Sequence, residues 1–370
     1  MNEEFHNNQQ MINNSMNIDE RNKQNNWDSY YKSKITIFYI VLIIITIISL
    51  LIIIYYIITE LPPSDYSIKA NYDYQTYYDS LYNYVPGVNI LEIWINGKNV
   101  FIDNASCKDT SGCEVLFIID LSDCTSLKGM FRNIKTLKSI SFSSGFDTKN
   151  ITDMSDLFQG CSSLTSIDIS HFDTSSVTKM SGMFYDCLWL KSLDISNFNT
   201  EKVTNMSGMF NYTRISSLDL SNFNTKNVVD MQSMFKCIYL TSIDLSNFDT
   251  TNVKYMDEMF SYSQYLKSIN LSSFNTENTI KMNNMFQSCK NLTSIDLSNF
   301  NTKKVTHMSE MFFSCSKLLY IDISSFTIAD INNNFNLFSS LPENGTLRIK
   351  SEYTDKIVSI PSSWTIEPVE

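Results

Sequence analysis

Glycine and proline, the residues that most often shape turns, are scarce in this chain. Nine Gly and six Pro occur in 370 residues, so Asn, Asp and Ser must make most of the turns through side-chain bonds to nearby backbone. Basic residues are also few, because 28 Lys and Arg stand against 39 Asp and Glu and the formal net charge is −11. A protein that neutralises phosphates needs a concentrated basic face, so we expect no nucleic-acid partner.

Patterns that carry catalytic or metal chemistry are missing as well. The three histidines, His6, His171 and His307, share no motif, and no Cys-x-x-Cys pair occurs. No nucleophile and base stand at a recognisable spacing. We therefore expect no enzyme, no resident metal and no cofactor.

One long stretch without charge predicts a membrane helix. Residues 35–59 are 25 uncharged residues, which as a helix would span roughly 37 Å, enough to cross a hydrocarbon core of about 30 Å. We interpret the stretch as a retained signal anchor of a single-pass protein in the cell membrane. Arg21, Lys23, Lys32 and Lys34 precede it and only Lys69 follows at a similar distance. A disordered tail, residues 1–34, should therefore be cytoplasmic and the rest extracellular.

A fixed period dominates the remainder of the chain. Phenylalanine recurs every 25 or 26 residues, at Phe146, Phe172, Phe198, Phe223, Phe248, Phe274, Phe300 and Phe326. Columns of Met, from Met154 to Met308, and of a second Phe, from Phe158 to Phe312, keep the same step. Every repeat should therefore bury the same positions, and the repeats should stack on one another.

The predicted fold class is an α/β solenoid, a leucine-rich-repeat-like stack of about eight coils with parallel strands. Within one coil we expect a strand at residues 166–170, a turn at 173–176 and a short helix over 178–184. The stack should occupy residues 121–340, after a Tyr-rich stalk at 60–90. Its caps should be residues 91–120, with a hairpin at Asn96-Gly97, and residues 341–370, with strand, helix and strand.

The repeat unit resembles a known family. Residues 164–187 read Leu-Thr-Ser-Ile-Asp-Ile-Ser-x-Phe-Asp-Thr-x-x-Val-Thr-x-Met-Ser-x-Met-Phe-x-x-Cys, and this resembles the repeats of BspA-like leucine-rich-repeat surface proteins of bacteria and some unicellular eukaryotes. The resemblance covers about residues 121–366. It implies a surface location, adhesion to host matrix or to other cells, and no catalytic residues. The N-terminal anchor departs from bacterial members that carry a lipid or a C-terminal sorting signal.

The middle residue of each predicted strand should point away from the core and form an acidic stripe. The stripe consists of Asp168, Asp194, Asp219, Asp244, Asn270, Asp296 and Asp322. Like charges about 5 Å apart repel, which favours either a basic partner or bound cations. One carboxylate per coil is a poor calcium cage, so we interpret the stripe as a solvated face that binds a partner.

The methionines and cysteines suit the core better than a metal. Each Met stands beside a Phe in every coil, which is typical of packing and not of copper binding. Five cysteines follow the Met-Phe pair as a predicted thiol column, with Cys161/Cys187 and Cys289/Cys315 as neighbours that an oxidising exterior could join. Cys107 and Cys113 form a separate local disulfide candidate.

Seven Asn-x-Ser/Thr sequences are possible glycosylation sites on the exterior. They begin at Asn104, Asn150, Asn205, Asn211, Asn270, Asn291 and Asn344. Together these patterns predict a membrane-anchored cell-surface protein that presents its repeats for adhesion or for binding an extracellular protein or glycan. The alternative is a structural coat or spacer without a specific ligand, since the Ser/Asp face lacks aromatic anchors.

Overall fold

The computed structural model describes residues 7–8, 23, 26, 32–51, 67–72, 81–100, 112–327, 336–357 and 359–370. The chain divides into two compact units, Met1–Pro62 and Pro63–Glu370. The first unit contains the helix Lys32–Leu51, which is long and apolar enough to cross a membrane. Its side chains are exposed along its whole length, as a lipid-facing helix requires. The last residues of the predicted span, 52–59, lie outside the described part of the chain.

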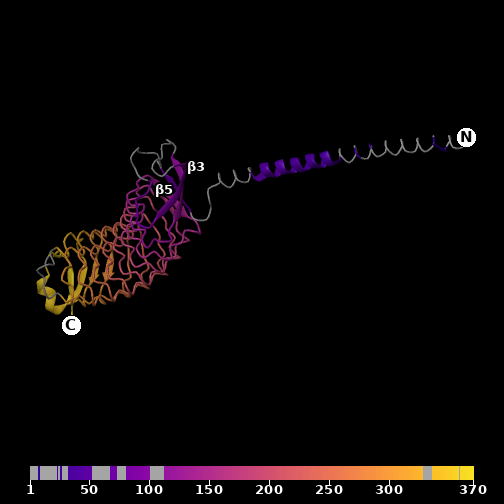
Figure 1. The fold of residues 1–370 in the computed structure, drawn as a ribbon. Helices are drawn as coiled ribbons and strands as arrows, with labels where there is room; N and C mark the ends of the chain where they lie inside the picture. Colours follow the sequence, from indigo (N-terminus) through magenta and orange to yellow (C-terminus); the bar gives the residue numbers. More distant parts are fainter. Residues whose placement is uncertain are drawn as a thin grey trace. The chain divides into compact units, whose positions relative to one another are not determined.

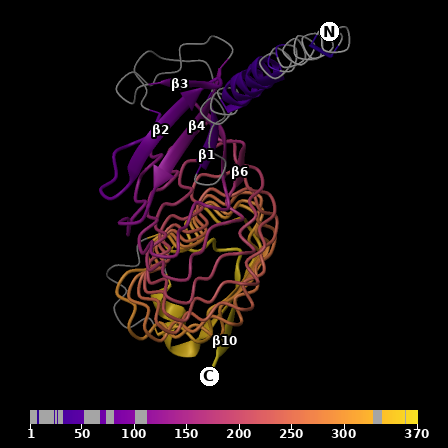
Figure 2. The same ribbon diagram turned by 45° about the vertical axis from the view of Figure 1, so that its right-hand side comes forward.

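The second unit begins with a six-stranded mixed sheet. Its strands are β1 (Ser67–Tyr72), β2 (Asn89–Ile95), β3 (Lys98–Val100), β4 (Cys113–Asp120), β5 (Leu137–Phe142) and β6 (Ser166–Asp168). Their order is β3-β2-β4-β1-β5-β6, so β1, from the segment predicted as a stalk, lies inside the sheet (Figure 2). The hairpin of β2 and β3 turns at Asn96 and Gly97, whose φ angles of 49° and 75° suit a type I′ turn.

The repeats that follow lie on one another as a series of loops (Figure 1). A column of phenylalanine rings runs through their core, with centroids 5.6–6.1 Å apart and interplanar angles of 4–12°. The rings belong to Phe131, Phe158, Phe184, Phe210, Phe235, Phe260, Phe286, Phe312 and Phe338. The neighbouring methionines are buried, so they pack in the core. Ring stacking of this kind adds about 0.5–1.5 kcal/mol per pair beyond burial.

Turns, and not helices, build the Met-Phe side of each repeat. Alternate backbone N–H groups bond to the next repeat, as Gly182 and Phe184 do to the carbonyls of Ser207 and Met209 at 2.8 and 3.0 Å. The groups between them close tight turns within the repeat, as Tyr185 does to Gly182 at 3.0 Å. Two residues per repeat must adopt left-handed φ angles to allow this alternation. In this repeat they are Gly182 at 61° and Asp186 at 58°.

Buried threonines join the repeats at a second place. The Thr174 hydroxyl donates to the Asn199 carbonyl at 2.9 Å and accepts the Asn199 N–H at 2.7 Å. The same exchange recurs at Thr148, Thr200, Thr250 and Thr302. The buried hydroxyl of the Phe-Asx-Thr segment therefore both donates and accepts in these five repeats, which meets its hydrogen-bonding needs without water.

A four-stranded parallel sheet ends the second unit. Its order is β10-β9-β8-β7, formed by β7 (Ser294–Asp296), β8 (Tyr320–Asp322), β9 (Thr346–Lys350) and β10 (Thr365–Val369). A 3₁₀ helix, η3 (Ser351–Lys356), lies between β9 and β10, where the helix of the C-terminal cap was expected.

The predicted α/β solenoid with leucine-rich-repeat-like coils is therefore wrong. One sheet is mixed and the other is separate from it, and the described residues of the second unit contain no α-helix. The helix expected over residues 178–184 does not form, because Gly182 has a left-handed φ angle within that span and Asp186 has another directly after it. No strand forms in the four described repeats between β6 and β7, where the inter-repeat hydrogen bonds at the expected strand positions are Ser216 N–H to Lys191 O at 3.3 Å and Lys267 N–H to Thr241 O at 3.0 Å.

Candidate binding surface

The predicted acidic stripe is exposed except at one end. Asp168, Asp194, Asp219, Asp244, Asn270 and Asp296 are exposed. Asp322 is buried in β8, where its Oδ2 lies 3.5 Å from Nη1 of Arg348 in β9. The expectation that Asp322 belongs to an outward face is therefore wrong, because the last sheet covers it.

The stripe residues bond to their own turns. In each, Oδ1 accepts the backbone N–H of the serine two positions later, at 2.9–3.1 Å. The backbone N–H and the hydroxyl of Ser221 lower the pKa of Asp219, and Ser246 lowers the pKa of Asp244 in the same way. Asn270 makes the bond without a charge, at 3.0 Å. The stripe side chains therefore stabilise the turn that follows them in each repeat.

The cysteines of the repeats are free thiols. Cys161, Cys187, Cys289 and Cys315 are buried, and each thiol donates to a phenylalanine carbonyl of the preceding repeat at 2.9–3.2 Å. Burial raises the pKa of Cys161 and of Cys315 to about 12, which suppresses the reactive thiolate. Cys237 differs, since it is half-buried. Cys113 is disulfide-bonded, and Cys107, its predicted partner, lies outside the described residues.

The sequons fall into three groups. Asn150, Asn270 and Asn344 are exposed. Asn205 and Asn291 are half-buried, and the Asn291 amide already donates to the Gln264 carbonyl at 2.7 Å. Asn211 is 5 % exposed, so a glycan would require the repeat to open. Asn104 lies outside the described part of the chain.

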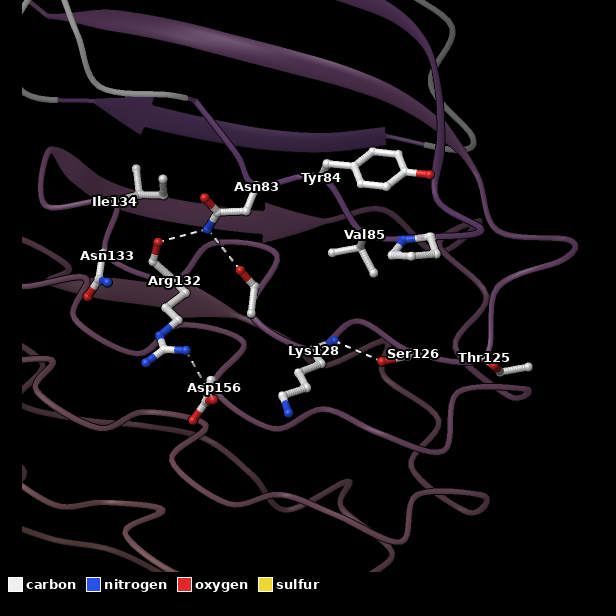
Figure 3. Close-up of a pocket in the computed structure, with 12 residues that line it drawn as sticks. Asn83, Tyr84, Val85, Thr125, Ser126, Lys128, Arg132, Asn133, Ile134 and Asp156 are labelled. Atoms are coloured by element: carbon white, nitrogen blue, oxygen red, sulfur yellow. Dashed lines mark hydrogen bonds and ion pairs between the residues drawn. The ribbon is translucent and has the colours of Figure 1, made fainter.

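An open cavity of about 830 Å³ lies beside the first repeats (Figure 3). The Asn83 amide donates to the carbonyls of Gly129 and Arg132 at 2.9 and 2.8 Å, and Nη1 of Arg132 lies 3.7 Å from Oδ2 of Asp156. These contacts hold the segment after residue 80 onto the first repeat. The polar groups that Figure 3 joins by dashed lines are therefore engaged in structure.

A second cavity lies at a corner where four consecutive repeats differ from the others. The corner is the one or two exposed or half-buried positions before a buried Leu or Ile, such as Leu190, Ile215, Leu240 and Leu266. Repeats toward the ends carry polar residues there: Lys135-Thr136, Ser162-Ser163, Lys290-Asn291 and Ser316-Lys317. The four middle repeats carry Leu188-Trp189, Arg214, Tyr239 and Gln264-Tyr265.

The side chains of these middle corners contact one another across repeats. The Arg214 guanidinium lies 4.3 Å from the centre of the Trp189 ring and 5.7 Å from that of Tyr239. Tyr239 stacks on Tyr265 with centroids 4.8 Å apart. The guanidinium is thus held by aromatic faces, an arrangement worth about 0.5–1 kcal/mol per contact at an exposed site.

A neighbouring column adds two more tyrosines in an unfavourable conformation. Tyr212 and Tyr262 occupy left-handed positions, with φ angles of 56° and 59°. Gly160, Asp186 and Ser288 hold the same position in other repeats. A bulky residue in this conformation is strained by about 1–2 kcal/mol, and such strain concentrates at functional sites.

These residues form one surface, the aromatic patch: Trp189, Tyr212, Arg214, Tyr239, Tyr262 and Tyr265. The five rings are 38–48 % exposed, so five large side chains of adjacent repeats meet solvent at one surface. A cavity of about 260 Å³ lies among them. Burial of its hydroxyl and the neighbouring Cys237 raise the pKa of Tyr212 to about 12, so the phenol stays neutral. The patch offers ring faces, hydroxyl groups and one cation.

The repeats match the model of a family described as Mycoplasma protein of unknown function, DUF285. The match comprises residues 125–243 and 236–347, which together exceed half of the chain. The chain belongs to this family. No curated protein and no solved structure matches it significantly.

The aromatic patch lies wholly within the DUF285 region, and inspection of the strand face alone missed it. The signal is present in the sequence. When the repeats of this chain are aligned with one another, the corner is Ser, Lys or Asn in some repeats and Trp, Arg or Tyr in others. The aromatic side chains of the corner are exposed, so burial in the core does not explain them. Departure from the repeat pattern was therefore the informative feature.

Proposed function

We propose that this protein is a membrane-anchored cell-surface protein that binds a macromolecular ligand through the aromatic patch. The patch carries the proposal, because Trp, Tyr and Arg are the residues that dominate binding energy at protein surfaces. Its rings are exposed in four adjacent repeats, while the equivalent corners of the other repeats are polar. Two of its tyrosines also retain backbone strain that Gly or Asn would relieve.

The anchor in this proposal is the helix Lys32–Leu51, with the N-terminus in the cytoplasm and the repeats outside the cell. The excess of Lys and Arg before the helix supports that orientation. The disulfide at Cys113 also supports it, because disulfides persist in oxidising compartments. The resemblance of residues 164–187 to BspA-like repeats supports adhesion as the purpose of ligand binding.

Adhesion of cells that display the full-length chain tests the patch. We expect the double variant Trp189→Ala/Tyr239→Ala to lower adhesion to immobilised matrix proteins and glycans about tenfold or more, since two anchors of this kind are lost. The matched control, Ser163→Ala/Lys290→Ala, alters the same corner in two repeats outside the patch and should leave adhesion unchanged. Equal adhesion of all three proteins would exclude the patch as the contact surface.

Surface labelling of intact cells tests the orientation. A peptide tag inserted after Gly97, in the β2–β3 turn, should be accessible to antibody on intact cells, whereas a tag at residue 2 should become accessible only after permeabilisation. The reverse pattern would contradict the proposed topology.

A spacer without a specific ligand is the second candidate. The stripe carboxylates favour it, because they bond to their own turns and leave the strand face without aromatic anchors. A spacer would tolerate the patch substitutions and would lose function only when the number of repeats changes.

A further inference from the structure

The cavity in the aromatic patch accepts one ring-sized group. Its volume of about 260 Å³ is below the roughly 300–1,000 Å³ of pockets that enclose drug-sized ligands. Tyr212, Tyr239, Tyr262 and Tyr265 are four of its ten lining residues, and Gln264 adds an amide. Flat ring faces beside hydroxyl and amide groups suit a ligand that is apolar on its faces and polar at its rim.

The cavity carries one uncompensated positive charge. Of the described residues that line it, Arg214 alone has a formal charge. Arg214 takes part in none of the ion pairs of the described residues. The nearby Lys236 is neutralised, because its Nζ lies 2.7 Å from Oε2 of Glu258. An oriented guanidinium without a carboxylate partner favours a ligand that brings its own anionic group.

Backbone pairing with a peptide is blocked at this surface. The N–H groups of Tyr212, Cys237 and Tyr262 already donate to the next repeat, at 3.0, 2.8 and 2.7 Å. A peptide therefore cannot bind here by adding a strand, which is one of the common modes of recognition. The cavity also lacks an aliphatic groove for a helix, since Leu188 and the buried Ile238 are its only aliphatic residues among those described.

We propose that the aromatic patch binds an acidic saccharide residue, one that carries a carboxylate or a sulfate. The sugar ring occupies the cavity that Tyr212 and Tyr262 line together with the stacked pair Tyr239 and Tyr265, and its anionic group binds the Arg214 guanidinium. The hydroxyl groups of the sugar meet the Gln264 amide and the tyrosine phenols. This inference rests on the proposed function, since it names the ligand class of the same surface.

Equilibrium titration with defined oligosaccharides tests the proposal. Full-length protein in nanodiscs of neutral lipid is titrated with sialyllactose, 6-sulfolactose, lactose and a tetraglutamate peptide. Binding of sialyllactose or sulfolactose, with lactose at least about tenfold weaker, is the expected result, because a charge-assisted pair is worth about that factor. The better of the two acidic sugars identifies the anionic group. Preference for tetraglutamate over both sugars would overturn the saccharide.

Three variants separate the charge from the rings. Arg214→Gln should weaken binding of the acidic sugar about tenfold and leave the affinity for lactose unchanged. Tyr239→Ala should weaken the binding of both the acidic sugar and lactose. Lys290→Gln, the matched control, removes a positive charge from the equivalent corner outside the patch and should alter neither.

The failures can be told apart. Suppose that no sugar binds, and that Tyr239→Ala abolishes adhesion of cells while Arg214→Gln does not. The proposed ligand class is then wrong, and the aromatic patch remains the proposed binding surface. If neither variant alters adhesion and no probe binds, both the ligand class and the proposed function are overturned.

Discussion

The core column of phenylalanines and the corner column of the same repeats obey different constraints. Nine repeats keep Phe in the core with nearly parallel rings, because any gap in that stack would leave its neighbours without contacts. The corner changes from Ser and Lys to Trp, Arg and Tyr and back again. Uniformity in a repeat protein therefore marks what holds the repeats together, and a local departure at an exposed position marks what the surface does.

The largest effect should come from the core column. Phe210→Ala is expected to lower the free energy of unfolding by about 3–5 kcal/mol, because the fully buried ring stacks on two neighbours. Phe210→Leu, which keeps most of the volume, should cost about 1–2 kcal/mol. Urea unfolding of the full-length protein in detergent measures both. A loss below about 1 kcal/mol for the alanine variant would contradict a continuous stack.

The threonine contacts between repeats should come next. Thr200→Val keeps the shape but leaves the Asn224 N–H and carbonyl without their bonds at 2.8 and 3.0 Å, so we expect a loss of about 1–3 kcal/mol. Thr204→Val is the control, since that hydroxyl is exposed and makes one bond of 3.2 Å. Equal effects of the two substitutions on the urea midpoint would show that burial of the hydroxyl is unimportant.

Substitutions in the patch should have smaller effects on stability, and one should have the opposite sign. Tyr262→Gly relieves left-handed strain of about 1–2 kcal/mol and loses about 1 kcal/mol in ring contact and chain entropy, so the net gain should be about 0.5 kcal/mol. Tyr265→Gly lacks this relief and should destabilise by about 1 kcal/mol. Differential scanning calorimetry distinguishes the pair, and a lower Tm for Tyr262→Gly would contradict the strain.

The smallest effect should come from the acidic stripe. The pKa of Asp194, Asp219 and Asp244 is lowered in the folded state. Their ionised forms therefore stabilise the fold above the unfolded pKa of about 3.9, and this is lost as pH falls through the folded pKa. Replacing all three by Asn should leave stability at pH 7 nearly unchanged, as Asn270 indicates, and should shift acid unfolding to lower pH. Unchanged acid unfolding, followed by circular dichroism, would contradict this role.

The period, the buried columns and the hairpin could be predicted from the sequence, because they depend on hydrophobic spacing and on Asn96-Gly97. The turn structure could not. Apolar residues at Met180, Met183 and Phe184 fit a helix equally well, and nothing in a residue such as Tyr212 signals a left-handed angle. The hydrogen bonds between repeats decide between the two conformations, and local spacing contains no information about them.

The candidate site could be predicted only in part. The stripe positions were predicted as strand midpoints, but Asp168, Asp296 and Asp322 end their strands and the other four lie in no strand. The contact of Asp322 with Arg348 could not be predicted either, because Arg348 lies in another strand. The aromatic patch assembles Trp189 and Tyr265 from repeats that are far apart in the sequence. Its members become visible when the corners of all the repeats are compared.

Binding by a protein that carries Tyr212→Gly and Tyr262→Gly together tests the central claim most directly. Full-length protein in nanodiscs would be assayed for both thermal unfolding and binding to immobilised matrix proteins and glycans. If the patch exists for binding, the double variant should unfold at the same temperature as the parent or higher, while its binding falls about tenfold or more. Full binding by this variant, with its Tm unchanged or raised, would contradict the account.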